Sequence, residues 1–441
     1  MLFRSKTLRQ RARRMLTESP AREPPLADVQ HAIEERARRD DDRGRGEHAA
    51  IGEFDAQIDS EFEGAPVRTY HLAPPLFAKR NPLTGRPEKK AFGPWLAPFL
   101  KGLARMKGMR GRWCDPFRLT ADRRLDRALL EDYERTITDL FYAKGLVRAG
   151  QLLGDSEYVA RAEALMDEVT RDIDRNALLN DQQPLAPNNP VRPVPGRHSL
   201  AGRMIGLYAM STFYEVTGEQ RYLDQGLDWL DFLMAHHVAS DDHRHAPAWS
   251  HDVWEFVDDA GQPYRMNSLL LSDPGHALEM VGLAFRLMLA GRMDGAGSHA
   301  ALSTAESLRV HRLSRVLQRC FANGFVSPQG CGIVKLFDLA TRTPVNDTMP
   351  WWSLPETMRA AALGARLCDG SPSQQSALLE ILRQSFNAFV THYVRRDLHL
   401  MAYQTLSALG QPVEVIPATP DADPGYHTSM SLMDMLDGIL R

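Results

Sequence analysis

The stretches AGQLLGDSEYVARAEALMDEV (residues 149–169) and FYEVTGEQRYLDQGLDWLDFL (residues 213–233) share one pattern, and this pattern decides the fold. Each ends one helix, turns through Gly-Asp or Gly-Glu, and begins a second helix with a tyrosine, Tyr158 or Tyr222, near its start. Glycine at such a turn is the residue expected at a left-handed helix C-cap. The chain therefore repeats a helical hairpin.

Weaker copies of the hairpin follow at residues 285–320 and 364–386, so that successive copies lie roughly 65–80 residues apart. Such hairpins must stack on one another, because none can bury its apolar face alone. Their long return loops differ from the ~34-residue units of open solenoids. The sequence thus predicts an all-α fold, an α/α toroid, whose loops form a cup at one rim. A short β-hairpin is expected within residues 330–345.

The chain of 441 residues divides into three parts by composition. Residues 1–60 are highly charged and poor in apolar residues, which predicts a disordered tail. Residues 61–121 are rich in proline, glycine and basic residues and are predicted to form an irregular arm packed on the main domain. Residues 122–441 carry the helical periodicity and are predicted to form the toroid.

Bulk properties exclude several classes of protein. A net charge of −3 does not favour nucleic acid as a partner. No window approaches 18 apolar residues, which argues against a membrane span, and the arginine-rich start lacks the apolar core of a secretory signal. We expect a cytoplasmic protein with free thiols, because the four cysteines form no C-x-x-C pair (Cys114, Cys320, Cys331 and Cys368).

The stretch LSDPGHALEMVGL (residues 271–283) places two titratable groups at the start of an apolar helix. Asp273 precedes Pro274 and is therefore predicted to be the N-cap. His276 and Glu279 lie three residues apart and share one face of the helix. A buried histidine satisfied by Glu279 would explain the pair without any function, so the other motifs decide its meaning.

Two later stretches also begin helices with unusual polar residues. MPWWSLPETMR (residues 349–359) brings Trp351, Trp352, Glu356 and Arg359 into the first turns of a helix. A flat indole beside a carboxylate suits a sugar, which stacks on the ring and donates hydroxyl protons to the carboxylate. DPGYHTSMSLMDML (residues 423–436) repeats the Asp-Pro-Gly start and delivers His427 to a helix. Two histidines at one rim would suit proton transfer near neutral pH.

These three motifs resemble those of the N-acylglucosamine 2-epimerase superfamily, which includes cellobiose 2-epimerases and mannose isomerases. The resemblance covers residues 125–441 and rests on Pro-Gly-His-x-x-Glu (274–279), Trp-Trp-x-x-x-Glu (351–356) and Tyr-His (426–427). It implies an (α/α)6 barrel, a mono- or oligosaccharide substrate, and proton transfer at C2 of the open-chain sugar without a metal or other cofactor. The sequence does not decide whether the protein forms a homodimer.

The resemblance also implies roles for individual residues. His276 and His427 would be the acid and base on opposite sides of an enediolate, and Glu279 would orient His276. Trp351, Trp352, Glu356 and Arg359 would contact the sugar. Two further contacts are expected from Arg135, the arginine nearest the usual position at Phe141, and from His198, which lies near the usual hairpin but out of phase.

The sequence departs from the family pattern at Gly282, where a tryptophan is common, and at Leu354, where a glutamine is common. The choice between epimerase and isomerase stays open. Two rivals keep the toroid: a glycoside hydrolase or polysaccharide lyase, for which Glu279 and Glu356 are the available carboxylate pair, and a catalytically silent toroid that binds a glycan or a protein.

Overall fold

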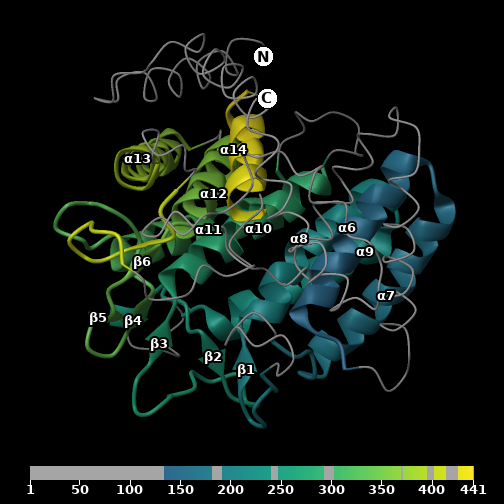
Figure 1. Ribbon diagram of the computed structural model, residues 1–441, viewed down its shortest axis with the longest axis horizontal. Helices are drawn as coiled ribbons and strands as arrows, with labels where there is room; N and C mark the ends of the chain where they lie inside the picture. Colours follow the sequence, from purple (N-terminus) through teal and green to yellow (C-terminus); the bar gives the residue numbers. More distant parts are fainter. Residues whose placement is uncertain are drawn as a thin grey trace, which may run out of the picture.

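The computed structural model describes most of the predicted toroid and leaves the predicted tail and arm outside the described residues. It describes residues 134–180, 191–239, 247–292, 302–368, 371–394, 402–413 and 426–440. These residues form nine α-helices: α6 (Ile137–Leu153), α7 (Ser156–Asp174), α8 (Ala201–Thr217), α9 (Gln220–Phe232), α10 (Pro274–Ala290), α11 (Thr304–Gly324), α12 (Ser353–Leu367), α13 (Pro372–Ala388) and α14 (Ser431–Leu440). Figure 1 shows them succeeding one another as hairpins.

The helices form two concentric layers. The inner helices α6, α8, α10, α12 and α14 pack side by side in chain order, and α7, α9, α11 and α13 each pack outside the inner helix that precedes them. The central helix α10 buries every residue from Ala277 to Phe285. Outer helix α11 instead buries a single stripe that includes Val310, Leu313 and Leu317. Apolar inner helices and amphipathic outer helices are what a ring of stacked hairpins requires.

The hairpin turns confirm the repeat on which the fold prediction was based. Gly154 ends α6 with φ 66° and Gly218 ends α8 with φ 72°, in the left-handed region that favours glycine. The two matched tyrosines, Tyr158 and Tyr222, are both buried beneath the outer helices that they begin. Each hairpin of the pair is therefore built by the same local chemistry.

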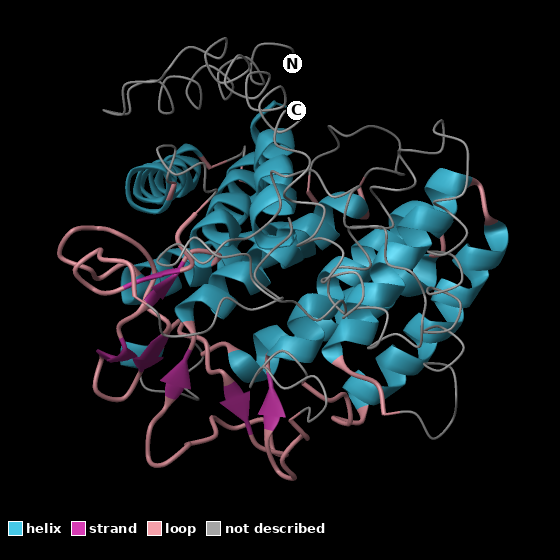
Figure 2. Ribbon diagram, viewed as in Figure 1, coloured by secondary structure: helices cyan, strands magenta, loops and turns pink. Residues whose placement is uncertain are grey.

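Two-residue strands lead into three of the inner helices, and we call them lead-in strands. They are β1 (His198–Ser199), β3 (Leu271–Ser272) and β6 (Met349–Pro350), which precede α8, α10 and α12. Each pairs antiparallel with a strand from the loop after the next outer helix: β2 (Phe256–Val257), β4 (Leu336–Asp338) and β7 (Thr405–Leu406). The start of each of these inner helices is thereby held by the following hairpin; β1 to β4 lie in the lower part of Figures 1 and 2, and β6 lies higher on the left.

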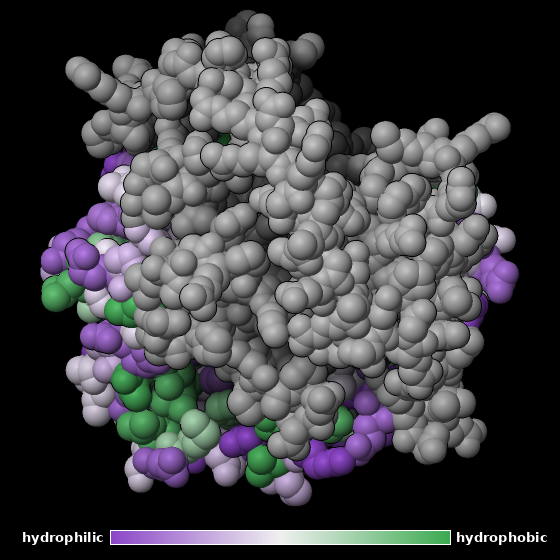
Figure 3. Space-filling view, viewed as in Figure 1, coloured by the Kyte–Doolittle hydropathy of each residue, from purple (hydrophilic) through white to green (hydrophobic). Residues whose placement is uncertain are grey.

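The predicted β-hairpin is confirmed, since β4 pairs antiparallel with β5 (Thr343–Asn346). The other strands were not predicted, because two residues are too few to show an alternating pattern. The rim that carries these strands shows both polar and apolar side chains along the lower edge of Figure 3. Among the described residues, no helix has the length and apolar character needed to span a membrane.

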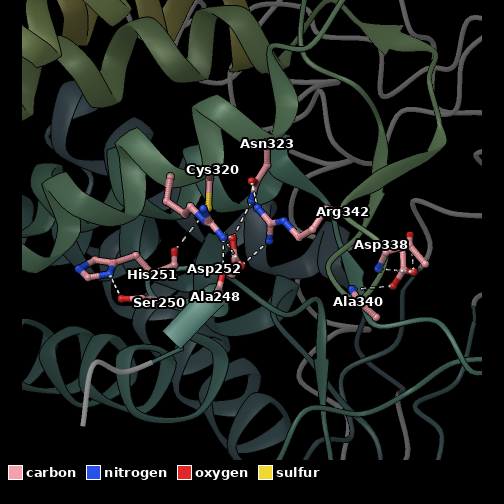
Figure 4. Close-up of polar contacts among 11 residues, drawn as sticks. Ala248, Ser250, His251, Asp252, Cys320, Asn323, Asp338, Ala340 and Arg342 are labelled. Carbon is pink, nitrogen blue, oxygen red and sulfur yellow. Dashed lines mark hydrogen bonds and ion pairs between the residues drawn. The ribbon is translucent and has the colours of Figure 1, made fainter. Parts of the chain in front are cut away.

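A buried carboxylate anchors the loop between α9 and α10 (Figure 4). Asp252 is fully buried and accepts hydrogen bonds from Arg319 Nε at 2.7 Å, Arg342 Nη1 at 2.6 Å and Asn323 Nδ2 at 2.7 Å. Two of these donors come from α11 and one from the turn after β4, so the loop is fixed to two neighbouring elements. Near it lies Cys320, one of three described cysteines, all buried free thiols as predicted (Cys320, Cys331 and Cys368).

Candidate active site

A cavity of about 700 Å³ opens among the starts of the inner helices. Its walls come from α6, from the first turn of α8, from His276 and Glu279 of α10, and from the tryptophan pair before α12. The π-helical turn Tyr426–Met430, which leads into α14, adds Tyr426 and His427. The three sequence motifs, which are far apart in the chain, therefore meet in one cavity.

His276 is held by a carboxylate that the sequence motifs did not include. Its Nδ1 lies 3.0 Å from Glu255 Oε1 and 3.1 Å from Oε2, and Glu255 is nearly buried. The expectation that Glu279 orients His276 is therefore wrong, because Glu255 has that role. A proton on Nδ1, shared with Glu255, leaves Nε2 as the nitrogen available to a ligand.

Asp273 supports His276 from below, as the predicted N-cap of α10. Its side chain accepts from the backbone N–H of Gly275 at 2.9 Å and of His276 at 3.2 Å, and it pairs with Lys335. Burial alone would lower the pKa of His276, but the carboxylates of Asp273 and Glu255 outweigh it and raise that pKa to about 9. His276 is thus an imidazolium at neutral pH.

His427 is held in the same way by a different carboxylate. Its Nδ1 lies 2.9 Å from Glu356 Oε1, which also accepts from Ser431 Oγ at 3.0 Å. The other oxygen of Glu356 accepts from the fully buried Arg359, whose Nε lies 3.1 Å from Asp434 Oδ2. A chain of buried charges therefore fixes the ring of His427 from below.

Glu279 lies between the two halves of the site. It is buried, lines the cavity, and has one oxygen 3.9 Å from His427 Nδ1. Burial and the neighbouring Glu356 carboxylate raise the pKa of Glu279, which favours its neutral acid form. A neutral carboxyl group in this place can donate a hydrogen bond to a sugar oxygen.

Trp352 contacts both imidazole rings. Its ring centroid lies 5.5 Å from that of His276 and 5.2 Å from that of His427. The neighbouring Trp351 is buried, and its Nε1 donates to Thr428 Oγ1 at 3.2 Å, which ties α12 to the turn that carries His427. Trp352 therefore lies between the two imidazole rings at the cavity wall, and its contact with a sugar stays a prediction.

Four residues predicted to contact the substrate do not line the cavity. Arg135 pairs with Asp172 and Glu168 of outer helix α7, and His198 pairs with Asp259 in the loops of the rim. Glu356 and Arg359 are fully buried beneath His427 rather than exposed to the cavity. Arg135 and His198 therefore lie outside the cavity, whereas Glu356 and Arg359 act on it from beneath, through His427 and through the pKa of Glu279.

The departures from the family pattern have local explanations. Gly282 lies where α10 meets α12, and a Cβ there would lie 3.3 Å from the backbone nitrogen of Ala360, so no tryptophan fits. Leu354 is fully buried in the core, and Phe141, where an arginine was expected, lines the cavity as an apolar wall. Neither Leu354 nor Phe141 can supply the polar contact that the resemblance implies at its position.

One cluster has the spacing of a metal site. Single ligand atoms of Glu279, Glu356 and His427 lie within 4.8 Å of one another. The Glu356 carboxylate already accepts from Arg359, whose guanidinium supplies the positive charge that a metal ion would bring. The donor set therefore fits a cation poorly.

Comparisons with known proteins agree with the geometry of the ring. The structure is similar to "D-mannose isomerase" (TM-score 0.58, 13% identity, covering 86% of this chain and 97% of the other). It is also similar to a "sugar epimerase from ruminal bacterium" (TM-score 0.58, 12% identity, 86% and 98%). The same holds for cellobiose 2-epimerase from Spirochaeta thermophila (TM-score 0.57, 15% identity, 87% and 97%).

The fold is that of the sugar 2-epimerases and isomerases. The predicted (α/α)6 toroid is thereby confirmed, and the resemblance drawn from the three motifs extends to the fold. A family model described as "Family of unknown function (DUF6537)" matches residues 48–151, most of which precede the described helices. No curated protein matches the sequence.

Proposed function

We propose that the protein is a cofactor-independent sugar isomerase or 2-epimerase, which moves a proton at C2 of an open-chain sugar. The observation that carries the proposal is the matched pair of histidines in one cavity. His276 and His427 each present Nδ1 to a buried carboxylate and each contact Trp352. Paired acid–base groups on either side of a bound carbon are what reversible proton transfer needs.

The charge environment of His276 assigns the starting roles of the two histidines in this proposal. The pKa of His276, raised to about 9, makes it the acid at neutral pH. His427 would then accept the proton from C2, and the electrons of that C–H bond would form the C1–C2 double bond of an enediol as the carbonyl oxygen gains a proton. Return of a proton to the opposite face of C2 gives the epimer, and return to C1 gives the isomer.

Glu279 supports the same step from the wall of the cavity. In its neutral form it can donate a hydrogen bond to the oxygen on which negative charge develops. Its raised pKa, caused by burial and by Glu356, keeps it in that form at higher pH than an ordinary glutamate.

Glycoside hydrolysis fits these residues less well. It needs two carboxylates that both reach the scissile bond, separated by ~5–10 Å. Ligand oxygens of Glu279 and Glu356 lie within 4.8 Å, and Glu356 is fully buried beneath His427. The second carboxylate is therefore already engaged and does not line the cavity.

The proposal is tested by proton exchange with deuterated water, followed by NMR, over a panel of aldoses and ketoses. We expect the wild type to incorporate deuterium at C2 or C1, and His276→Asn and His427→Asn each to lose at least ~100-fold of the rate. His311→Asn, on the exposed face of α11, is the matched control and should keep the wild-type rate. Equal exchange by all variants would refute the roles of the two histidines, and no exchange by the wild type with any sugar would leave the glycan-binding toroid instead.

A further inference from the structure

Tyr426 has a buried hydroxyl group that no group in the described part of the chain satisfies. The residue is 7% exposed and lines the cavity, and its Oη has no hydrogen-bond partner. A buried hydroxyl without a partner costs free energy, so it marks a place where a ligand or an ordered water completes the hydrogen bond. Neither catalytic imidazole uses this hydroxyl through Nδ1, since both of those nitrogens pair with carboxylates.

Glu279 carries a second unsatisfied atom in the same region. It is buried and lines the cavity, and its Oε1, which lies 3.9 Å from His427 Nδ1, has no hydrogen-bond partner among the described residues. The ring of Tyr426 meets the ring of His427 edge to face, with centroids 4.7 Å apart. Both residues with unsatisfied atoms therefore adjoin the imidazole of His427.

The ring of Tyr426 is fixed by its neighbours. The ring of Phe141 meets it edge to face at 4.7 Å, and Lys144 Nζ lies 4.2 Å from its centroid. Lys144 is itself buried, and its Nζ also lies 4.5 Å from the centroid of the Tyr208 ring. A donor that is held in place before a ligand binds needs no reorganisation during the reaction, which is the condition for stabilising a developing charge.

This packing gives Phe141 a role in the cavity. The family resemblance implies an arginine at that position, and an arginine would donate hydrogen bonds to the sugar. Phe141 instead lines the cavity and supports the ring of Tyr426. Tyr426 therefore places a hydrogen-bond donor next to the position where the donor of the family pattern is missing.

Tyr426 and Glu279 both favour their protonated forms. Burial and the carboxylates of Glu279 and Glu356 raise the pKa of Tyr426 well above its ordinary value. Burial and Glu356 likewise raise the pKa of Glu279. Each group then offers one O–H donor. A phenol and an uncharged carboxylic acid in a buried site are a donor pair that stabilises an enolate.

We propose that Tyr426 is a further catalytic residue, which forms an oxyanion hole together with Glu279. As His427 takes the proton from C2, the electrons of the C–H bond form the C1–C2 double bond, and the π electrons of the carbonyl group move onto O1. Tyr426 Oη and neutral Glu279 each donate a hydrogen bond to O1 and keep their protons, and His276 then protonates O1. This role rests on the proposed function, but the donor pair is also testable by binding alone.

The kinetic test is Tyr426→Phe in the full chain, which removes only the hydroxyl group. We expect the maximal rate of deuterium exchange to fall by ~100-fold or more with little change in KM, because the hydrogen bond strengthens as charge develops on the oxygen. Tyr222→Phe is the matched control. It removes the hydroxyl of another buried tyrosine, which donates to Glu163 between two outer helices and lies outside the cavity, and it should keep the wild-type rate.

Binding of an enediolate analogue separates a catalytic role from a structural one. The probe is D-arabinonohydroxamate, whose hydroxamate group resembles the enediolate shared by glucose, mannose and fructose; for any other sugar that exchanges, the corresponding aldonohydroxamate replaces it. By calorimetry we expect the wild type to bind the hydroxamate at least ~100-fold more tightly than the sugar. Tyr426→Phe should lose ~10-fold or more of the affinity for the hydroxamate and keep its affinity for the sugar.

The outcomes separate the oxyanion hole from the proposed function. Wild-type exchange with an unchanged rate and unchanged hydroxamate affinity in Tyr426→Phe overturns the hole, assigns the hydroxyl to an ordered water and keeps the isomerase. A wild type that binds the hydroxamate no more tightly than the sugar overturns the hole even if the variant fails to fold. No exchange with any sugar refutes the isomerase: hydroxamate binding that depends on Tyr426 would then keep the donor pair, and its absence would refute both.

Discussion

Replacing Glu255 by glutamine should lower the pKa of His276 without changing the shape of the cavity. The pKa of His276, about 9 against an ordinary 6.5, corresponds to about 3 kcal/mol of favourable interaction with the charged ring. Glutamine keeps the length of the side chain but removes one of the two charges behind this shift, and Asp273 remains. We expect the pKa of His276 to fall by at least ~1 unit.

The pKa of His276 can be followed by NMR titration of ring-labelled histidine, with His276→Asn to assign the signal. Asp259→Asn is the matched control, because it removes a histidine–carboxylate contact at His198, outside the cavity. The control should leave the His276 titration unchanged. A wild-type pKa near 6.5, or the same pKa in Glu255→Gln, would refute the assignment of His276 as the acid.

The contact between Glu255 and His276 also predicts how the stability of the protein depends on pH. Because the pKa of His276 is higher in the folded chain than in the unfolded one, its contribution is fully present below pH ~6.5. It is lost as pH rises through the folded value of about 9. Denaturant unfolding should therefore show a loss of about 3 kcal/mol of unfolding free energy across this window, and a smaller loss in Glu255→Gln.

Three further predictions concern the support of the site. Arg359→Met leaves Glu356 and Asp434 without their buried partner and should cost ~3–5 kcal/mol of unfolding free energy, measured by denaturant titration; a cost under ~1 kcal/mol would contradict the buried charge chain. Gly282→Trp should destabilise the protein by more than Gly282→Ala, because even a Cβ lies 3.3 Å from Ala360; equal melting temperatures for the two variants would contradict this packing. Chelation by EDTA should leave deuterium exchange unchanged, whereas a loss restored by added divalent metal would place an ion at Glu279 and His427.

The ring of hairpins could be predicted from the sequence because its signals are local. Each hairpin turn can be recognised from residues that are close together in the sequence: a left-handed glycine, Gly154 or Gly218, and a buried tyrosine a few residues later, Tyr158 or Tyr222. The N-cap at Asp273 was predictable for the same reason. The similar Asp-Pro-Gly at residues 423–425 lies outside the described residues, so that repetition stays a prediction.

The partners of the histidines could not be predicted in the same way. Glu255 reaches His276 from 21 positions earlier in the chain, and Glu356 reaches His427 from 71 positions earlier. Neither contact has a fixed spacing, because each depends on how one hairpin packs against the next. Spacing along one helix instead pointed to Glu279, which faces the other histidine. The expected substrate contacts of Arg135 and His198 could not be checked from spacing either, because their partners belong to outer helix α7 and to a distant loop.

The lead-in strands have a consequence for how this protein can change over evolutionary time. An open solenoid gains or loses repeats one at a time, because each repeat contacts only its neighbours. Here the loop after α9 supplies β2 to hold the start of α8, and its Glu255 also holds His276 at the start of α10. Deleting or duplicating one hairpin would remove or displace a contact that holds the start of another. The hairpins of this ring therefore depend on one another in a way that the repeats of an open solenoid do not.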